Sequence, residues 1–268
     1  MIQIKTPAEV AKMRTAGLVV AETLAAVRAA VAPGVTPRDL DALAETELRS
    51  RGGVPSFLGY HGFPATLCVS VNDEVVHGIP QDRPIKTGNV VSIDCGAIVE
   101  GWHGDAAVTV PVGDVPPEAA ALVRTCEDAL WAGISAMQAG GRLRDIGTAV
   151  ERHVREAGSY GIVEEFGGHG IGTEMHQDPH VLNYRTRQRG PRLVPGLVLA
   201  VEPMINLGTA DTVLLEDGWT VKTADGSWSA HFEHSVAVTA DGPWVLTALD
   251  GGAARLAELG VPTPAIAT

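Results

Sequence analysis

Two helices followed by strands occur twice along the chain, and this repeat constrains the fold more than any other feature. The first copy starts at Thr6, where Thr-Pro-Ala-Glu forms a capping box, and the second starts at Pro116. A shift of 106 positions superimposes the glycines and the second helices of the two copies. We therefore predict an internal duplication, with α+β halves of about 1–113 and 114–250 that meet along an antiparallel sheet, and a short tail after about residue 260.

Composition and charge exclude several classes of protein. The chain has 268 residues, a formal net charge of −12 and a pI near 5.1. Binding to DNA or to an anionic membrane requires a basic surface instead. The three cysteines show no paired spacing, and no apolar run approaches the roughly 18 residues of a membrane span. We expect a soluble cytoplasmic protein whose partner is small or peptidic, with no DNA and no membrane among its partners.

Two aspartates occur in the segment VVSIDCGAIVEGWHGDAAVTV, which alternates as two strands around a turn. With the turn near Val99 and Glu100, Asp94 lies directly opposite Asp105. Opposed like charges destabilise a strand pair by roughly 0.2–1 kcal/mol, and by more when they are buried. A cation between the carboxylates removes this repulsion. The alternative is a pair of aspartates beside a turn on a solvated face.

Three further candidate ligands occur in glycine-rich or strand-like segments. His169 lies among four glycines in FGGHGIGTEMHQDPHVLNY, where the backbone can approach a bound group closely. Glu202 interrupts the apolar strand LVLAVEPMI, and Glu233 lies on the alternating strand SAHFEHSVAVT. Neither strand holds a Lys or Arg that would pair with the carboxylate. Either metal ions hold these side chains, or the imidazole is structural and the carboxylates are protonated or paired with a distant Arg.

Together, these residues form a set that suits two metal ions. Four acids and one imidazole are costly to bring together unless cations lie among them. The two aspartates belong to the first half of the predicted duplication and the other three residues to the second half. We therefore predict a metal site at the seam between the halves.

On these residues and on longer motifs, the chain resembles the type I methionine aminopeptidases, which are metallopeptidases of the pita-bread fold. The resemblance extends from about residue 4 to about residue 249, in the family's order and approximate spacing. Its motifs are YHGFPATLCVSVNDEVVHGIP, IDCGAIVEGWHGDAAVT, FGGHGIGTEMHQDPHVLNY, VEPMI, DGWTVKT and SAHFEHSVAVT. It implies a pita-bread fold of two pseudo-symmetric halves, with an antiparallel sheet covered by helices, in a single catalytic domain over residues 1–268.

The resemblance also implies that the five candidates form a dinuclear metal site. Asp105 and Glu233 would bridge the two ions, Asp94 would complete one ion, and His169 with Glu202 would complete the other. Oxygen ligands with one imidazole favour divalent Mn, Fe or Co. A hydroxide activated by the two ions would attack the scissile carbonyl, and Glu202 would also be catalytic by transferring a proton.

The activity that the resemblance implies is removal of the N-terminal methionine from nascent polypeptides when the next residue is small. His77, in NDEVVHGIP, and His176 match two catalytic histidines of the family that are not metal ligands. His176 would hydrogen-bond the developing oxyanion, and His77 the scissile amide or the leaving amine. The alternative for each is a histidine satisfied within the core.

A substrate pocket for the methionine side chain is implied as well. Aromatic rings and sulfur suit a thioether. The matching residues are Phe57, Tyr60, Phe63, Cys68, His77, Met175, His176 and Trp219. The chain departs from the family's pattern at Phe57, where a cysteine is frequent, and at Met175, where phenylalanine is common. Core packing is an equally good interpretation of Phe57.

Two other functions compete with this interpretation. Aminopeptidase P and prolidase use the same five ligands to cleave Xaa-Pro bonds, but they usually add an N-terminal domain, whereas the first helix here begins at about residue 7. A non-catalytic pita-bread protein that binds RNA or protein is the second alternative. Such proteins lose ligands, and all five candidates are present here.

One basic segment, NYRTRQRGPR, stands out from the acidic chain. It holds Arg185, Arg187, Arg189 and Arg192. This loop would suit a transient contact with ribosomal RNA near the exit of the nascent chain. A solvated loop is the alternative interpretation. We expect the chain to be a compact monomer.

Overall fold

The first helix pair begins where the sequence predicts. In the computed structural model, α1 (Pro7–Ala30) follows Thr6, whose hydroxyl accepts a hydrogen bond from the Glu9 N–H at 3.3 Å. The Glu9 carboxylate in turn accepts one from the Thr6 N–H at 2.7 Å. Helix α2 (Pro37–Ser50) repeats this capping box from Thr36. Both boxes satisfy backbone N–H groups that a first helical turn otherwise leaves without partners.

The second helix pair also has the predicted order. Helix α3 (Pro117–Ser135) ends where the Ala136 N–H closes a tighter turn with the Gly133 carbonyl, three residues earlier. Helix α4 (Leu143–Ala157) then follows as predicted. A short helix near the C-terminus, α5 (Ala253–Glu258), was not predicted.

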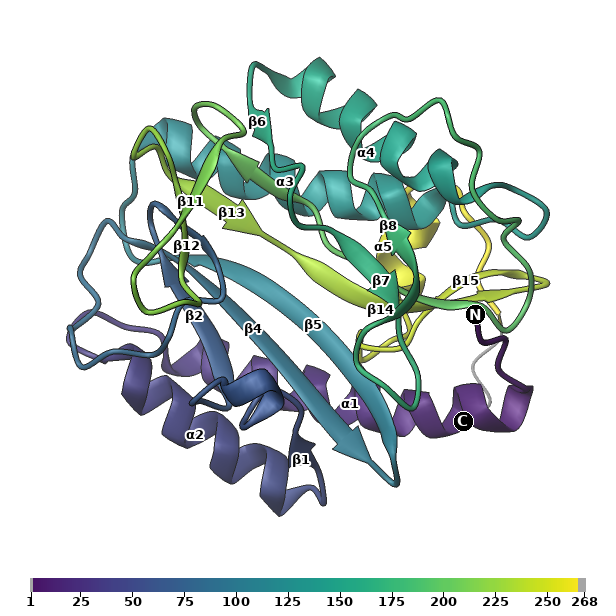
Figure 1. Ribbon diagram of the computed structural model, residues 1–268, viewed down its shortest axis with the longest axis horizontal. Coiled ribbons are helices and arrows are strands. Elements are labelled where there is room, and N and C mark those ends of the chain that lie inside the picture. The colour runs from purple at the N-terminus through teal and green to yellow at the C-terminus, as the bar shows by residue number, and fades with distance from the viewer. Residues whose placement is uncertain (1, 265–268) are drawn as a thin grey trace.

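The structure describes residues 2–264, and most of its strands in that range join one nine-stranded sheet. The strand order is β1-β4-β5-β14-β9-β7-β8, with β2 beside β4 and β15 beside β14 (Figure 1). Two three-stranded sheets, β13-β10-β6 and β11-β12-β3, complete the fold. The strands are β1 (Val54–Pro55), β2 (Leu67–Val71), β3 (Glu74–Val76), β4 (Val90–Val99), β5 (Trp102–Pro111), β6 (Gly161–Ile162), β7 (Gly168–Gly170), β8 (Gln177–Val181), β9 (Val198–Val201), β10 (Met204–Asn206), β11 (Thr212–Leu214), β12 (Val221–Thr223), β13 (Ser229–His231), β14 (Glu233–Thr239) and β15 (Gly242–Val245), and a 3-10 turn, η1, spans Tyr60–Gly62. Residues 261–264 of the predicted tail carry no helix or strand, and the rest of that tail lies outside the described residues.

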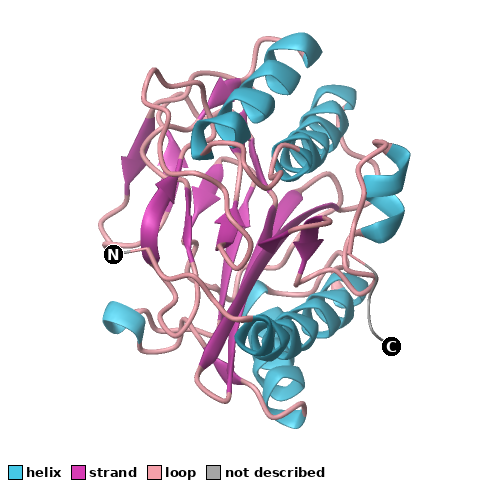
Figure 2. Cartoon of the chain, turned by 90° about the vertical axis from the view of Figure 1, so that its right-hand side faces the viewer, coloured by secondary structure: helices cyan, strands magenta, loops and turns pink. Residues whose placement is uncertain are grey.

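Each helix pair covers one end of the large sheet. Helices α1 and α2 bury an apolar cluster with β2, β4 and β5 that includes Leu48 and Ile93, and α3 and α4 bury another with β9 and β14 that includes Leu130 and Val201. Burial of each such side chain stabilises the fold by about 1.5–3 kcal/mol. Figure 2 shows the strands between this helical layer and a face covered by loops. The predicted α+β class, with an antiparallel sheet covered by helices, is confirmed.

The β4–β5 hairpin differs in register from the prediction. Its turn residues are Glu100 and Gly101, with φ values of 49° and 81°, the left-handed conformation that a two-residue hairpin turn requires. Asp94 therefore faces Ala107, and the prediction that it lies directly opposite Asp105 is wrong by two residues. Because side chains alternate between faces with a period of two, both aspartates still point to the same face, as diagonal neighbours.

Among the helices of the described residues, none combines the length and the apolar character that crossing a bilayer requires.

Candidate metal centre and substrate pocket

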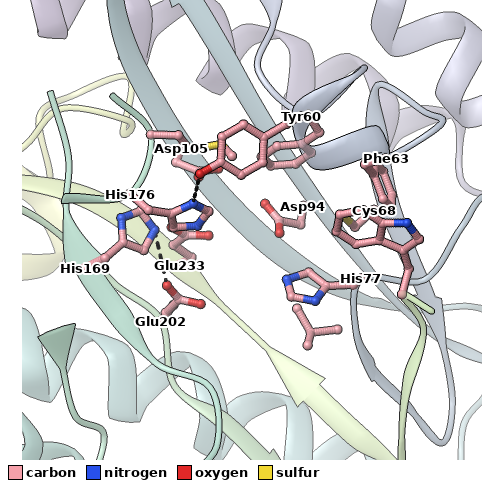
Figure 3. Close-up of a pocket in the computed structure, with 14 residues that line it drawn as sticks. Tyr60, Phe63, Cys68, His77, Asp94, Asp105, His169, His176, Glu202 and Glu233 are labelled. Atoms are coloured by element: carbon pink, nitrogen blue, oxygen red, sulfur yellow. Dashed lines mark hydrogen bonds and ion pairs between the residues drawn. The ribbon is translucent and has the colours of Figure 1, made fainter. Parts of the chain in front are cut away.

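All of the predicted site residues line a single pocket (Figure 3). One side of it is acidic: Asp94, Asp105, His169, Glu202 and Glu233. The rest is mainly apolar and aromatic: Phe57, Tyr60, Phe63, Cys68, His77, Met175, His176 and Trp219. Val76, which the sequence did not single out, completes the lining.

The five candidate ligands come from neighbouring strands in the middle of the large sheet. Asp94 and Asp105 come from the β4–β5 hairpin, and Glu233 is the first residue of β14, which pairs with β5. His169 lies on β7, and Glu202 directly follows β9, the strand that pairs with β7. The strand order β4-β5-β14-β9-β7 therefore brings acids of the first half beside the imidazole and acids of the second.

The acidic side holds buried oxygen atoms without partners. Asp94 Oδ1, Asp105 Oδ1 and Glu233 Oε1 form no hydrogen bond with any described residue. Asp105 is 4% exposed and Glu233 is 2% exposed, and no described Lys or Arg forms an ion pair with either. A buried carboxylate in this condition costs several kcal/mol unless a cation or a proton neutralises it. The residues present therefore fit divalent cations, which take carboxylate oxygen and imidazole nitrogen as ligands.

The pKa values of these acids in the metal-free protein reflect the same cost of burying carboxylates together. Burial raises the pKa of Asp94 to about 7 and that of Glu202 to about 8. Burial, reinforced by the charge of Asp94, raises the pKa of Asp105 well above its ordinary value, and burial with repulsion from Asp105 does the same to Glu233. The acids therefore hold protons near neutral pH, and a bound cation would displace those protons.

The His169 imidazole presents one nitrogen to the acidic side. Its Nδ1 donates a hydrogen bond to the Gly170 carbonyl at 3.0 Å, so in the neutral ring Nε2 carries a free lone pair. That Nε2 lies 3.5 Å from Glu202 Oε1. Burial lowers the pKa of His169 to about 3, which keeps the ring neutral. A neutral imidazole whose other nitrogen is held by a carbonyl is the usual arrangement of a metal ligand.

The two other predicted histidines flank the acidic side. The His176 ring lies 4.3 Å from the His169 ring between centroids, and its Nδ1 is 2.8 Å from the Tyr60 hydroxyl. His77 has a left-handed backbone with φ of 59°, and its ring stands edge-on to Trp219. Backbone strain of this kind is typical of functional sites. Burial lowers the pKa of His77 to about 4, so the ring is neutral at physiological pH.

The apolar side is a small hydrophobic cluster of its own, separate from the clusters under the helices. Phe63, Cys68 and Met175 are buried in it, and Phe63 contacts Trp219 edge-to-face with centroids 5.1 Å apart. Cys68 of β2 pairs with Asp94 of β4, so the apolar side directly adjoins the acidic side.

Phe57 lies both in the pocket lining and in the packing on the sheet. Its ring lines the pocket, and it also packs on the sheet above Gly96, where an added Cβ would come within 2.8 Å of the ring. The absent side chain at Gly96 therefore gives the ring its place on β4.

The sequence interpretation missed one residue beside the acids, His231. Its Nε2 lies 3.8 Å from Glu202 Oε2, and one donor atom from each of Glu202, His231 and Glu233 lies within 4.8 Å of the other two. Asp105, His169 and Glu233 form a second set with the same spacing. His231 lies two residues before Glu233 in the alternating segment SAHFEHSVAVT, so both side chains are expected on the same face. This spacing of two residues was the signal that could have identified His231.

Known proteins resemble the chain over most of its length. The model of metallopeptidase family M24 matches residues 11–240. Methionine aminopeptidase 1 of Mycobacterium tuberculosis is 52% identical over 249 residues, which cover 91% of this chain and 94% of that protein. The crystal structure of methionine aminopeptidase from Rickettsia prowazekii is 42% identical and superimposes with a TM-score of 0.90, covering 92% of this chain and all of that one.

A prolidase shares the fold at greater distance. The prolidase from Pyrococcus furiosus is 21% identical with a TM-score of 0.74, and the match covers 91% of this chain but 65% of that chain. Both identity and coverage are higher for the methionine aminopeptidases. The chain therefore belongs to the methionine aminopeptidases of metallopeptidase family M24.

Proposed function

We propose that this enzyme releases the N-terminal methionine of polypeptides whose second residue is small, and that the reaction depends on divalent metal ions. One observation carries the proposal: buried carboxylate oxygens with no hydrogen-bond partner in the described part of the chain lie directly beside an apolar pocket lined by aromatic rings and sulfur. The high identity to proteins named methionine aminopeptidase supports it.

Two ions would be held by the five candidate ligands, Asp94, Asp105, His169, Glu202 and Glu233. Their oxygen-rich donor set favours Mn, Fe or Co. When bound, such ions polarise a carbonyl group and bring the pKa of a water molecule near neutrality.

Three side chains would then handle protons and the charge that develops on the substrate. Glu202, a carboxylate beside both the ions and the substrate pocket, would accept a proton and pass it to the leaving amine. If the Tyr60 hydroxyl donates to His176 Nδ1, then Nε2 carries the ring proton and can donate to the developing oxyanion. The neutral His77 would hydrogen-bond the scissile amide.

The apolar side would bind the methionine side chain. Phe63, Trp219 and Met175 offer ring faces and a polarisable sulfur to a thioether. Tyr60 and His176, which are joined by a hydrogen bond, would crowd the residue that follows methionine and so limit its size.

The decisive experiment compares release of methionine from Met-Ala-Ser and from Met-Leu-Ser. The enzyme is first treated with a chelator, and Mn, Fe, Co and Zn are then returned one at a time. We expect chelation to abolish release and Mn, Fe or Co to restore it, for Met-Ala-Ser only. Activity that ignores chelation would refute metal dependence, and preferred cleavage of Xaa-Pro peptides would favour the prolidase interpretation. Failure to bind any divalent ion at micromolar concentration would favour a binding protein instead.

We also propose that the enzyme acts as a cytoplasmic monomer, as one catalytic domain with halves of about 1–113 and 114–250. One sheet contains strands from both halves, which supports a single domain built from two halves. The side chains of Arg185, Arg187, Arg189 and Arg192 are exposed, as a transient contact with ribosomal RNA requires. Co-sedimentation with ribosomes should fall with rising salt and with Arg-to-Ala changes, and co-sedimentation that survives those changes would refute the contact.

A further inference from the structure

His231 is a buried imidazole next to the acidic side of the pocket whose role the proposed mechanism leaves open. It ends β13 and pairs with Met204 of β10. Side chains two residues apart in extended chain point to the same side, so His231 and Glu233 share a face. His234 points the other way, and its Nδ1 is 2.8 Å from the Thr247 hydroxyl.

The Glu202 carboxylate lies between two imidazoles. Its Oε1 is 3.5 Å from His169 Nε2, and its Oε2 is 3.8 Å from His231 Nε2. The second distance is too long for a hydrogen bond. Two donors that each lie about 2.1 Å from one ion are roughly 3–4.2 Å apart, so the distance suits two ligands of a shared cation. His231 Nε2 therefore lies at nearly the same distance from the Glu202 carboxylate as Nε2 of the expected ligand His169.

His231 is buried on a fixed backbone, and one nitrogen of its ring has no hydrogen-bond partner among the described residues. The residue is 1% exposed, and this nitrogen is Nε2. Its backbone is fixed by Thr109, whose hydroxyl accepts from the His231 N–H at 2.9 Å and donates to the His231 carbonyl at 2.6 Å. A buried polar atom without a partner costs about 1–3 kcal/mol, and coordination of a cation would remove that cost.

We propose that His231 is a further metal ligand, which brings a second imidazole nitrogen to an ion held by Glu202 and Glu233. This inference rests on the proposed metal-dependent function. A second nitrogen donor also has a consequence for metal choice, because imidazole suits Co and Zn better than Mn. His231 thus strengthens the selection of Co over Mn in this chain.

The test counts the imidazole nitrogens that coordinate Co²⁺. In the Co²⁺-loaded enzyme, each coordinated imidazole gives a strongly shifted exchangeable N–H signal in the proton NMR spectrum. We expect two such signals in the wild type and one in His231→Gln, and calorimetry should show Co²⁺ binding weakened about tenfold or more. Mn²⁺ binding should weaken less. His234→Gln is the matched control, because it changes a neighbouring histidine on the opposite face and should alter neither the signals nor the affinity.

Every outcome decides the inference. The same number of signals in the wild type and in His231→Gln overturns it, even if affinity falls, because His231 would then only position Glu202. Thermal unfolding of the metal-free proteins verifies that the variant folds, and His231→Asn replaces it if it does not. Release of methionine from Met-Ala-Ser by the same Co²⁺-loaded wild type tests the proposed function separately. Release with only one coordinated imidazole would sink this inference alone, whereas two coordinated imidazoles without release would sink the function alone.

Discussion

On the acidic side of the pocket, Asp94, Asp105 and Glu233 carry buried oxygens that have no hydrogen-bond partner within residues 2–264. On the apolar side, Phe63 and Trp219 pack edge-to-face within a hydrophobic cluster that is stabilised mainly by apolar contacts. The acidic side destabilises the metal-free fold, because its carboxyl groups, once removed from water, must either stay ionised and repel each other or take up protons. The apolar side stabilises the fold whether or not an ion or substrate is bound.

Because the two sides of the pocket affect folding in opposite ways, mutations on each side should have different effects on stability and on function. Loss of a group on the acidic side should reduce activity while leaving the metal-free fold as stable as before, or more stable. Loss of a group on the apolar side should reduce both stability and substrate binding while leaving metal affinity unchanged. Each of the following changes tests that separation.

Asp105→Asn should have the largest effect. The variant keeps the shape of the side chain but removes one of the proposed metal ligands, and with it several kcal/mol of metal-derived stabilisation of the transition state, so kcat/KM should fall by about 10³-fold or more. The metal content, measured by mass spectrometry, should fall with it. The Tm of the metal-free variant should equal or exceed that of the metal-free wild type, because Asp105 must take up a proton or remain as a buried charge when the chain folds, and Asn does neither.

The control for this change is Asp82→Asn. Asp82 pairs with Arg38 at 2.7 Å on an open surface, where an ion pair contributes little. Its activity and metal content should match those of the wild type. A metal-free Asp105→Asn protein that is clearly less stable than wild type would contradict the view that the acidic side opposes folding.

His77→Ala should lower kcat by about 10²–10³-fold, which is the typical effect of removing one hydrogen-bond donor aimed at the transition state. The metal content should stay unchanged, because His77 is not among the candidate ligands. His77→Asn provides a second variant, since Asn tolerates the left-handed φ of 59° at this position. Loss of bound metal in either variant would show that the assigned role is wrong.

A change of pH should alter the acidic side without any mutation. Asp94 and Glu202 have folded-state pKa values of about 7 and about 8, so a cation must displace protons from them. The affinity for Co²⁺ should therefore rise by more than about tenfold between pH 6 and pH 8. Isothermal titration at each pH measures this directly, and a flat profile would contradict the raised pKa values.

The same pKa values fix the sign of a stability effect. Because they lie above the values of unfolded Asp and Glu, these groups stabilise the metal-free fold at low pH, and this contribution is lost as the pH rises through 7 and 8. Histidines with lowered pKa values, such as His169 at about 3, act in the opposite direction, but only below about pH 6.5. Between pH 6.5 and 8, the Tm of the metal-free enzyme should therefore fall, and that of the metal-loaded enzyme should fall less.

The sequence predicted which residues form the acidic side better than it predicted how they are arranged. Isolated charges on apolar strands pointed to Glu202 and Glu233, because such residues require a partner wherever they lie. Two like charges on one hairpin pointed to Asp94 and Asp105. The hairpin register was wrong by two residues, because it depended on which two residues adopt positive φ, and the turn uses Glu100 with Gly101. Such a local backbone preference is weaker than the alternation that defines the strands.

His231 escaped notice for a different reason. Its distance to Glu202 depends on how β13 pairs with β10, and that pairing joins segments with no local pattern in common. Helix starts were predictable because a capping box is contained in four consecutive residues, as at Thr6. Proximity across a sheet is not local, so the sequence alone did not reveal it.

Met175→Leu should give the smallest effect and the sharpest contrast between the two sides. The substitution conserves volume, so it should destabilise the fold by less than about 1.5 kcal/mol, but it removes the sulfur that would contact the substrate, and kcat/KM should fall by several-fold at most. Met13→Leu is the matched control, because Met13 is equally buried in a cluster beneath α1, away from the pocket. Both variants should show similar losses of Tm and full metal affinity, while only Met175→Leu changes KM for Met-Ala-Ser. A change of Co²⁺ affinity in Met175→Leu would mean that the two sides of the pocket are coupled, since a neutral side chain can alter metal binding only by moving the acids that we propose as ligands.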